Sequence, residues 1–128
     1  MVPATLRLET ADGTVVAEHC AVAGTFLARF RGLMWRRELP EGEGLCLQNS
    51  GSIHMFFMRF ALDVAFVDAD GRVLHACHTI RPWRISRVVF GSKAAVELPA
   101  GTLRKLGIDR GSVLKLTPSR PDPEPPRP

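Results

Sequence analysis

Three side chains that lie close together in the sequence could do chemistry, and they are His54, Arg59 and Asp63. Asp63 interrupts the apolar run 62–67, where a carboxylate without a partner costs on the order of several kcal/mol. Arg59 and His54 could donate hydrogen bonds to an anion while Asp63 orients one of them. These residue types therefore predict a binding site for a small anionic or carboxylate-bearing molecule.

The same residues allow a purely structural interpretation. Asp63 could be held in a buried ion pair by Arg59 or by Arg31, with His54 bonded only to backbone. Glu97 is a second carboxylate in a strand-like run and could face the same interior as Asp63. In that arrangement, His54 and either carboxylate could act as an acid and base pair.

Hydrolysis and metal binding are further alternatives, and each lacks part of its pattern. Ser52 and His54 on one strand face would be about 6.6 Å apart along the chain, beyond the roughly 3 Å that proton transfer needs. No Gly-x-Ser-x-Gly turn is present to expose a nucleophile. His54, Met55 and Met58 could be soft ligands for Cu(I), but no paired motif completes a ligand set. We therefore expect no metal and no cofactor.

A second candidate surface is the basic segment 81–87, where Trp83 stands among arginines that include Arg84. Pro82 removes a backbone donor and should break the preceding strand, which predicts an exposed connection. An aromatic ring among cations suits contact with an acidic protein or a single-stranded nucleic acid. Packing of Trp83 onto the end of the fold, with the arginines in solvent, is the structural alternative.

The segments that must position these residues are mostly strands. Alternating apolar residues and turn signals predict strands over 5–10, 14–18, 45–47, 62–67, 72–80, 88–90, 93–98 and 112–116. Helical spacing predicts a short helix over 25–35 with Thr25 as its N-cap, and one or two helical turns over 102–107. The fold class expected from this pattern is α+β and predominantly β.

Length and composition place limits on the remaining questions. We expect one domain over residues 1–117 and a disordered proline-rich tail over 118–128. The net charge of +4 favours anionic partners but is modest for a nucleic-acid binder. The three cysteines fit no metal or disulfide motif and should be free thiols. No apolar run has the length of a signal peptide or membrane span, which predicts a cytoplasmic protein without membrane contact.

Several separate motifs resemble one known family. They are Arg31-Gly32-Leu33-Met34, the segments 52–68 and 95–101, and Leu106-Gly107-Ile108 with Gly111. In this order, over residues from about 20 to 117, they resemble the family catalogued as domain of unknown function 192. The resemblance implies a small antiparallel or mixed sheet, partly closed like a barrel, with one or two short helices, and it implies no established activity. Many members look like exported proteins with a leader, and the family often has a Trp where this chain has Phe57.

Overall fold

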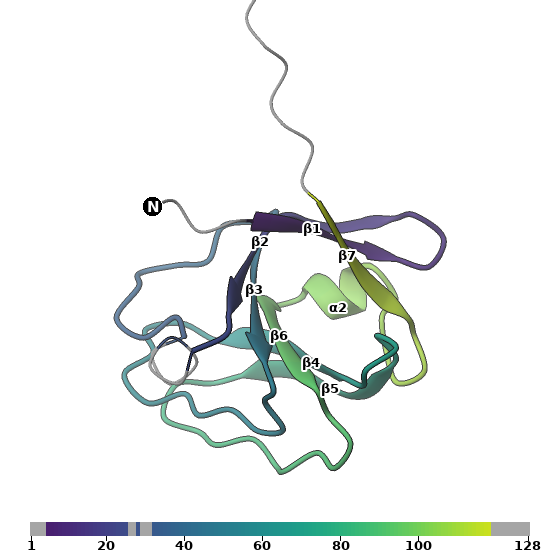
Figure 1. Cartoon of the computed structure of the whole chain (residues 1–128). Helices are drawn as coiled ribbons and strands as arrows, with labels where there is room; N and C mark the ends of the chain where they lie inside the picture. The colour runs from purple at the N-terminus through teal and green to yellow at the C-terminus, as the bar shows by residue number, and fades with distance from the viewer. Residues whose placement is uncertain (1–4, 26–27, 29–31, 119–128) are drawn as a thin grey trace, which may run out of the picture.

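A computed structural model describes residues 5–25, 28 and 32–118, and in this part of the chain it contains seven strands and one helix. The strands are β1 (Thr5–Thr10), β2 (Val15–Ala23), β3 (Glu43–Gln48), β4 (Leu62–Val67), β5 (Val73–Ile80), β6 (Ala94–Pro99) and β7 (Leu114–Pro118), and the helix is α2 (Thr102–Lys105). They form one sheet in the order β5-β4-β6-β3-β2-β1-β7. Only β2 and β3 pair in parallel among these neighbours, so the sheet is mixed (Figure 1).

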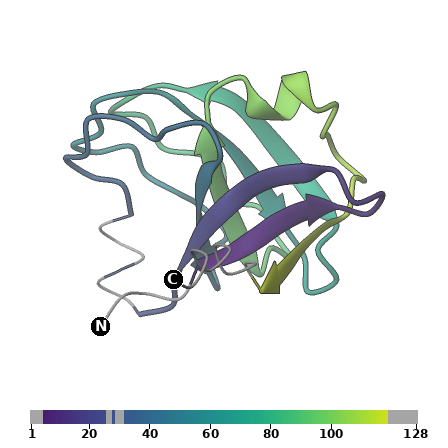
Figure 2. The same cartoon turned by 90° about the horizontal axis from the view of Figure 1, so that it is seen from above.

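The sheet curls into an open half-barrel whose edge strands meet at one point. Arg72 and Val113 form an isolated bridge, and the Leu114 N–H donates to Gly71 O at 2.8 Å. Gly71 has a φ of 81°, and a Cβ there would lie 2.0 Å from Leu114 O, so only glycine permits this approach. The predicted β-rich, partly closed barrel is therefore confirmed, and α2 covers one end of it (Figures 1 and 2).

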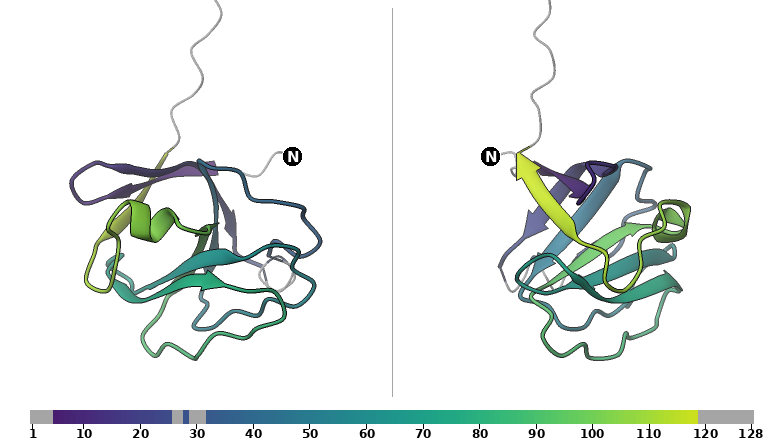
Figure 3. Two further views of the ribbon diagram at one scale, coloured as in Figure 1. Left: turned by 180° about the vertical axis from the view of Figure 1, so that it is seen from behind. Right: turned by 90° about the vertical axis from the view of Figure 1, so that its right-hand side faces the viewer.

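The two faces of the sheet carry two separate apolar cores. The inner core gathers around Leu8, Ala65, Val96 and Leu103, so α2 belongs to it. The outer core lies on the opposite face, where Val64 and Phe66 pack with loop residues such as Ile53 and Met55. Because neighbouring residues of a strand point to opposite faces, each strand of the centre contributes to both cores. Figure 3 shows the long loops gathered on the side of the sheet away from α2.

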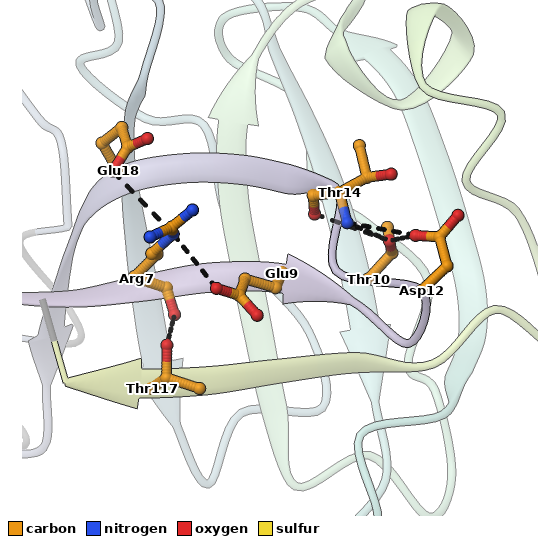
Figure 4. A network of polar contacts seen from close by, with 7 residues as sticks. All are labelled: Arg7, Glu9, Thr10, Asp12, Thr14, Glu18 and Thr117. Carbon is orange, nitrogen blue, oxygen red and sulfur yellow. Dashed lines mark hydrogen bonds and ion pairs between the residues drawn. The ribbon is translucent and has the colours of Figure 1, made fainter.

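The strands predicted over 5–10 and 14–18, and over 62–67 and 72–80, are confirmed as two antiparallel hairpins, and the β1–β2 turn shows why. The Thr14 N–H donates to Asp12 Oδ1 at 3.1 Å, while the Thr10 hydroxyl donates to the same carboxylate oxygen (Figure 4). Further along the hairpin, Arg7 Nε lies 3.1 Å from Glu9 Oε1, an ion pair without the alignment of a hydrogen bond. These contacts are largely local, so a short stretch of sequence is enough to predict the turn.

Two sequence-based predictions of local structure had other outcomes. The strand predicted over 88–90 is wrong, because this segment is irregular and its only backbone bond to the 49–61 loop runs from Val89 N–H to Gly51 O, at 2.7 Å. Of the helix predicted over 25–35, residues 26, 27 and 29–31 lie outside the described residues, and 32–35 form a turn instead of a helix. The Ala28 N–H does donate to Thr25 Oγ1 at 3.1 Å, as an N-cap requires. No helix in the described part is long and apolar enough to cross a membrane.

Candidate functional site

Asp63 is fully buried, and the structure gives its carboxylate two backbone partners. The Thr79 N–H donates to Oδ1 at 2.8 Å, and the Leu103 N–H donates to Oδ2 at 2.9 Å. Thr79 sits at an irregularity in the β4–β5 pairing with a φ of 54°, and Leu103 lies in the first turn of α2. One side chain therefore fastens both the bulge of β5 and the start of α2 to β4.

This geometry corrects the sequence-based view of Asp63 in two ways. No described Lys, Arg or His side chain is bonded to Asp63. Each of its two oxygens accepts a hydrogen bond from a backbone N–H instead. Arg31 lies outside the described part of the chain. Asp63 pairs in register with Leu98, whereas Glu97 pairs with Val64, so the two carboxylates point to opposite faces of the sheet. The expected convergence of Asp63 with His54 and Glu97 on one interior is therefore wrong.

Glu97 is instead the buried acid of the outer face. The residue is 4% exposed, and no described residue donates a hydrogen bond to Oε2. Burial raises the pKa of Glu97 to about 8, so this carboxyl holds its proton at neutral pH. A cavity of about 50 Å³ opens beside it, and His54 and Met58 also line this cavity. Two candidate residues from the sequence, His54 and Glu97, thus share one small pocket.

The tautomer of the neutral His54 ring is indicated by a hydrogen bond from a nearby backbone N–H. The Phe56 N–H donates to His54 Nδ1 at 3.2 Å, so Nδ1 is an acceptor and the ring hydrogen of the neutral form lies on Nε2. The His54 ring also stacks on Phe56 at a centroid distance of 5.1 Å. His54 therefore lies between the cavity beside Glu97 and the aromatic rings of Phe56 and Trp83.

Three loops are bonded together over the outer face. Met55 N–H donates to Arg84 O, and Trp83 N–H donates to Met55 O, both at 2.7 Å. Trp35 N–H donates to Phe57 O at 3.1 Å, which attaches the third loop. The candidate segments 54–63 and 81–87 therefore form one surface and are not separate sites. Asp63 is the exception, because it is buried on the other face of the sheet.

Apolar side chains are exposed on these loops to an unusual degree. Of the seven large hydrophobic residues that are exposed in the described part of the chain, six lie here: Trp35, Phe57, Trp83, Ile85, Val88 and Phe90. Six exposed arginines accompany them: Arg36, Arg37, Arg59, Arg81, Arg84 and Arg87. We call these twelve residues the loop surface. The segments 32–37, 49–61 and 81–93 contain no Asp or Glu, so the loop surface is positively charged.

The backbone of the loop surface is strained where its aromatic residues stand. Trp35, Phe57 and Trp83 have φ values of 65°, 62° and 68°, in the left-handed region that bulky residues avoid. Their rings touch, with centroids 5.7 Å apart for Trp35 and Phe57 and 5.0 Å apart for Phe57 and Trp83. Backbone strain of this kind is found preferentially at functional sites. The strain is thus a second indication, besides the exposure of the rings, that these three residues belong to a functional site.

Sequence reasoning found part of this surface and missed the rest. The prediction of an exposed connection at Trp83 and Arg84 is confirmed, and Arg59 is exposed as well. Val88 and Phe90 fall in the strand predicted over 88–90, and their exposure was not predicted. A signal was available in the sequence. Residues 81–93 contain four basic residues and no acidic one, and Pro82 and Gly91 mark the segment as a loop.

The remaining candidate groups are dispersed. Cys20, Cys46 and Cys77 are free thiols, the first two buried in the inner core. Within the described ranges, no three His, Cys, Asp or Glu side chains gather in a way that could hold a metal ion. A larger hollow of about 570 Å³ opens at Cys46 and Leu114, but among the described residues it holds no buried polar side chain that lacks a partner.

Comparisons with known proteins agree on the family and the fold. Residues 7–116 match the family model DUF192, described as an uncharacterized ACR. A UPF0127 protein of Thermococcus kodakarensis is 33% identical over 102 residues, covering 77% of this chain and 64% of that protein, so the chain spans under two thirds of this relative's length. A UPF0127 protein of Thermococcus gammatolerans is 35% identical over 106 residues, covering 80% and 69%.

Two crystal structures share the fold. A protein of unknown function from Novosphingobium aromaticivorans has a TM-score of 0.75 at 24% identity, covering 87% of this chain and 83% of that one. A protein from Sinorhizobium meliloti, described as a candidate transcription regulator, has a TM-score of 0.71 at 26% identity, covering 91% and 97%.

Proposed function

The chain belongs to the DUF192 family of uncharacterised proteins, and we propose that it is a binding module whose loop surface takes an acidic, apolar segment of a partner protein. One observation carries the proposal, which is that six of the seven exposed large hydrophobic residues of the described chain lie on this surface among arginines. Contiguous exposed apolar patches on a folded protein generally mark interaction sites. Tryptophan and arginine are the side chains that contribute most often to binding hot spots.

The charges of the loop surface favour an acidic partner. Its six arginines are exposed and have no acidic residue within the same loop segments 32–37, 49–61 and 81–93. Arginine binds carboxylates through paired N–H donors, and a positive field also speeds the approach of a negative partner. An acidic segment would therefore gain both orientation and association rate from this surface.

Aliphatic exposure favours a protein over a nucleic acid. Ile85 is 65% exposed and Val88 is 58% exposed, beside aromatic Phe90 at 90%. Nucleic-acid surfaces use aromatic rings to stack on bases, but branched aliphatic side chains offer them little. The description of the Sinorhizobium meliloti structure as a candidate transcription regulator keeps a nucleic acid as the competing ligand to be tested.

The test uses fluorescence anisotropy with three probes. These are a labelled dodecapeptide of glutamate, leucine and phenylalanine, the same peptide with lysine for glutamate, and a labelled 15-mer of deoxythymidine. We expect the acidic peptide to bind at least tenfold more tightly than the basic one, and to weaken as salt rises. Tighter binding of the oligonucleotide, or equal binding of the two peptides, would overturn the assignment.

Trp83→Gly separates binding from folding. Glycine tolerates the φ of 68° at this position, so the free energy of unfolding should stay the same or rise by up to about 1 kcal/mol. Binding of the acidic peptide should fall at least tenfold, because the ring that contacts Phe56 and Phe57 is gone. The control is Leu116→Gly, which removes an exposed hydrophobic side chain on β7 outside the loop surface and should leave peptide binding unchanged.

A further inference from the structure

Glu97 is a buried acid that the fold itself does not use. It stands between Leu45 of β3 and Val64 of β4 in register, on a face that is otherwise apolar. Its Oε2 atom is covered and receives no hydrogen bond from the described part of the chain. A buried polar group without a partner destabilises the folded state, and such groups are concentrated where a ligand uses them.

The adjoining cavity determines the size of that ligand. Its volume of about 50 Å³ has room for on the order of four water molecules, or for a small head group with one or two methylenes, so the rest of a longer stem would lie at the mouth of the cavity. The walls are mainly Leu33, Met34, Leu47, Ile53 and Met58, and the polar lining besides Glu97 consists of Ser50, Ser52 and His54. His54 is the one other titratable side chain among the described lining residues.

We propose that this cavity binds a primary ammonium group on a short alkyl stem, with Glu97 as its counter-ion. The apolar walls contact the stem, and Oε2 accepts an N–H bond from the ammonium nitrogen. As the cation enters, the neutral carboxyl loses its proton to solvent and becomes a carboxylate. The cavity is therefore uncharged before and after binding, and one proton is released for each ammonium bound.

Other ligand charges fit this cavity less well. An anion would face Glu97 as a like charge whenever the carboxyl ionises, and an apolar group would leave Oε2 without a partner. A cation is the ligand that stabilises a buried carboxylate most. The ammonium could belong to a free alkylamine or to a lysine side chain of a partner, and the chemistry at Glu97 is the same for both.

This site goes beyond the proposed function, because it does not involve the exposed arginines. The acidic-peptide assay reports on the loop surface, and an amine titration reports on the Glu97 cavity. The binding of acidic peptides could therefore fail while the binding of amines is found, and the reverse.

The test is isothermal titration calorimetry of the full chain with n-butylammonium chloride, in two buffers of different ionisation enthalpy. We expect one proton released per cation, and an affinity that rises about tenfold per pH unit from pH 5 to 7 and levels off near pH 8, where Glu97 is ionised before binding. Parallel titrations with n-butanol and with sodium butyrate should show at least tenfold weaker binding. Acetyl-lysine-amide tests the side-chain source, and binding equal to that of butylammonium would assign the site to a lysine of a partner.

Glu97→Gln keeps the shape of the side chain and should abolish butylammonium binding. The matched control is Glu38→Gln, which removes one exposed carboxylate that does not line the cavity and should leave binding unchanged. Equal binding of butylammonium and butanol would overturn the proposal. So would a ¹³C NMR titration that places the pKa of Glu97 below 6 in the wild type and shows it rising in Arg31→Met, since the carboxyl would then be paired within the chain.

Discussion

Asp63→Asn tests whether the buried carboxylate of β4 holds the fold together. In the wild type each oxygen serves a different amide, Oδ1 for Thr79 and Oδ2 for Leu103. Asparagine keeps one acceptor oxygen but turns an NH₂ group toward the other backbone N–H. One of the two amides therefore loses its acceptor and meets a second donor in a site that is 0% exposed to solvent.

The expected loss of stability is about 3 kcal/mol. A hydrogen bond to a charged group contributes about 1.5–3 kcal/mol, and a buried donor left without a partner costs about 1–3 kcal/mol. Some of this is recovered if Thr79, whose φ of 54° is held by the bond to Asp63, relaxes to an ordinary conformation. Urea unfolding followed by far-ultraviolet circular dichroism measures the difference, with equal m-values in both proteins.

Asp68→Asn is the matched control, because Asp68 also accepts two backbone N–H bonds. Both bonds, from Asp70 and Arg72, go to the same atom, Oδ1, at 2.9 and 3.0 Å in an exposed turn. Asparagine retains that oxygen, so the loss should stay below about 1 kcal/mol. Equal losses for the two variants would refute the reasoning. An Asp63→Asn protein of unchanged stability would return Asp63 to the list of ligand-binding candidates.

Two further predictions follow from buried groups. Because burial raises the pKa of Glu97 from 4.5 to about 8, the folded chain keeps a proton that the unfolded chain loses between these values. The free energy of unfolding should therefore fall as pH rises through this window, by up to about 1.4 kcal/mol per unit, and Glu97→Gln should lack this contribution in urea titrations from pH 5 to 8; parallel slopes would contradict it. Burial also raises the pKa of Cys20 to about 12 and raises that of Cys46, so mass spectrometry should find both thiols unalkylated by iodoacetamide in the native protein and alkylated in urea. Fast native labelling would contradict their burial.

The hairpins could be predicted from the sequence because their information is local. Alternation and the Asp12-Gly13 signal specify β1 and β2 within a few residues of one another. The partners of Asp63 could not be predicted, since Thr79 and Leu103 lie 16 and 40 residues away and contribute backbone amides that any residue carries. The sequence showed that the buried charge of Asp63 needed hydrogen-bond donors or a cation, but it did not show which groups supply them.

The exposure of Val88 and Phe90 was missed for a different reason. Val88 and Phe90 have the composition of core residues, and hydrophobicity alone does not tell whether a partner from the same chain will cover them. Here the segment 81–93 runs over the outer face and buries Val89 while it exposes its two neighbours. Strand-like alternation was therefore present, but with the apolar side chains on the solvent side as well.

The two buried carboxylates suggest that the two faces of the sheet have different roles, one in stability and the other in binding. Asp63 faces the inner core and both of its oxygens accept hydrogen bonds, whereas Glu97 faces the outer core and its Oε2 has no hydrogen-bond partner among the described residues. Folding alone would favour an apolar side chain at position 97, beside Leu45 and Val64, because removing an unpaired buried acid stabilises a core. The strained aromatic residues of the loop surface lie over this same outer face. Apart from Thr79, whose strained φ is held by Asp63, the destabilising features described above lie on the outer face. This is the distribution expected when that face is kept for a ligand and the other holds the fold.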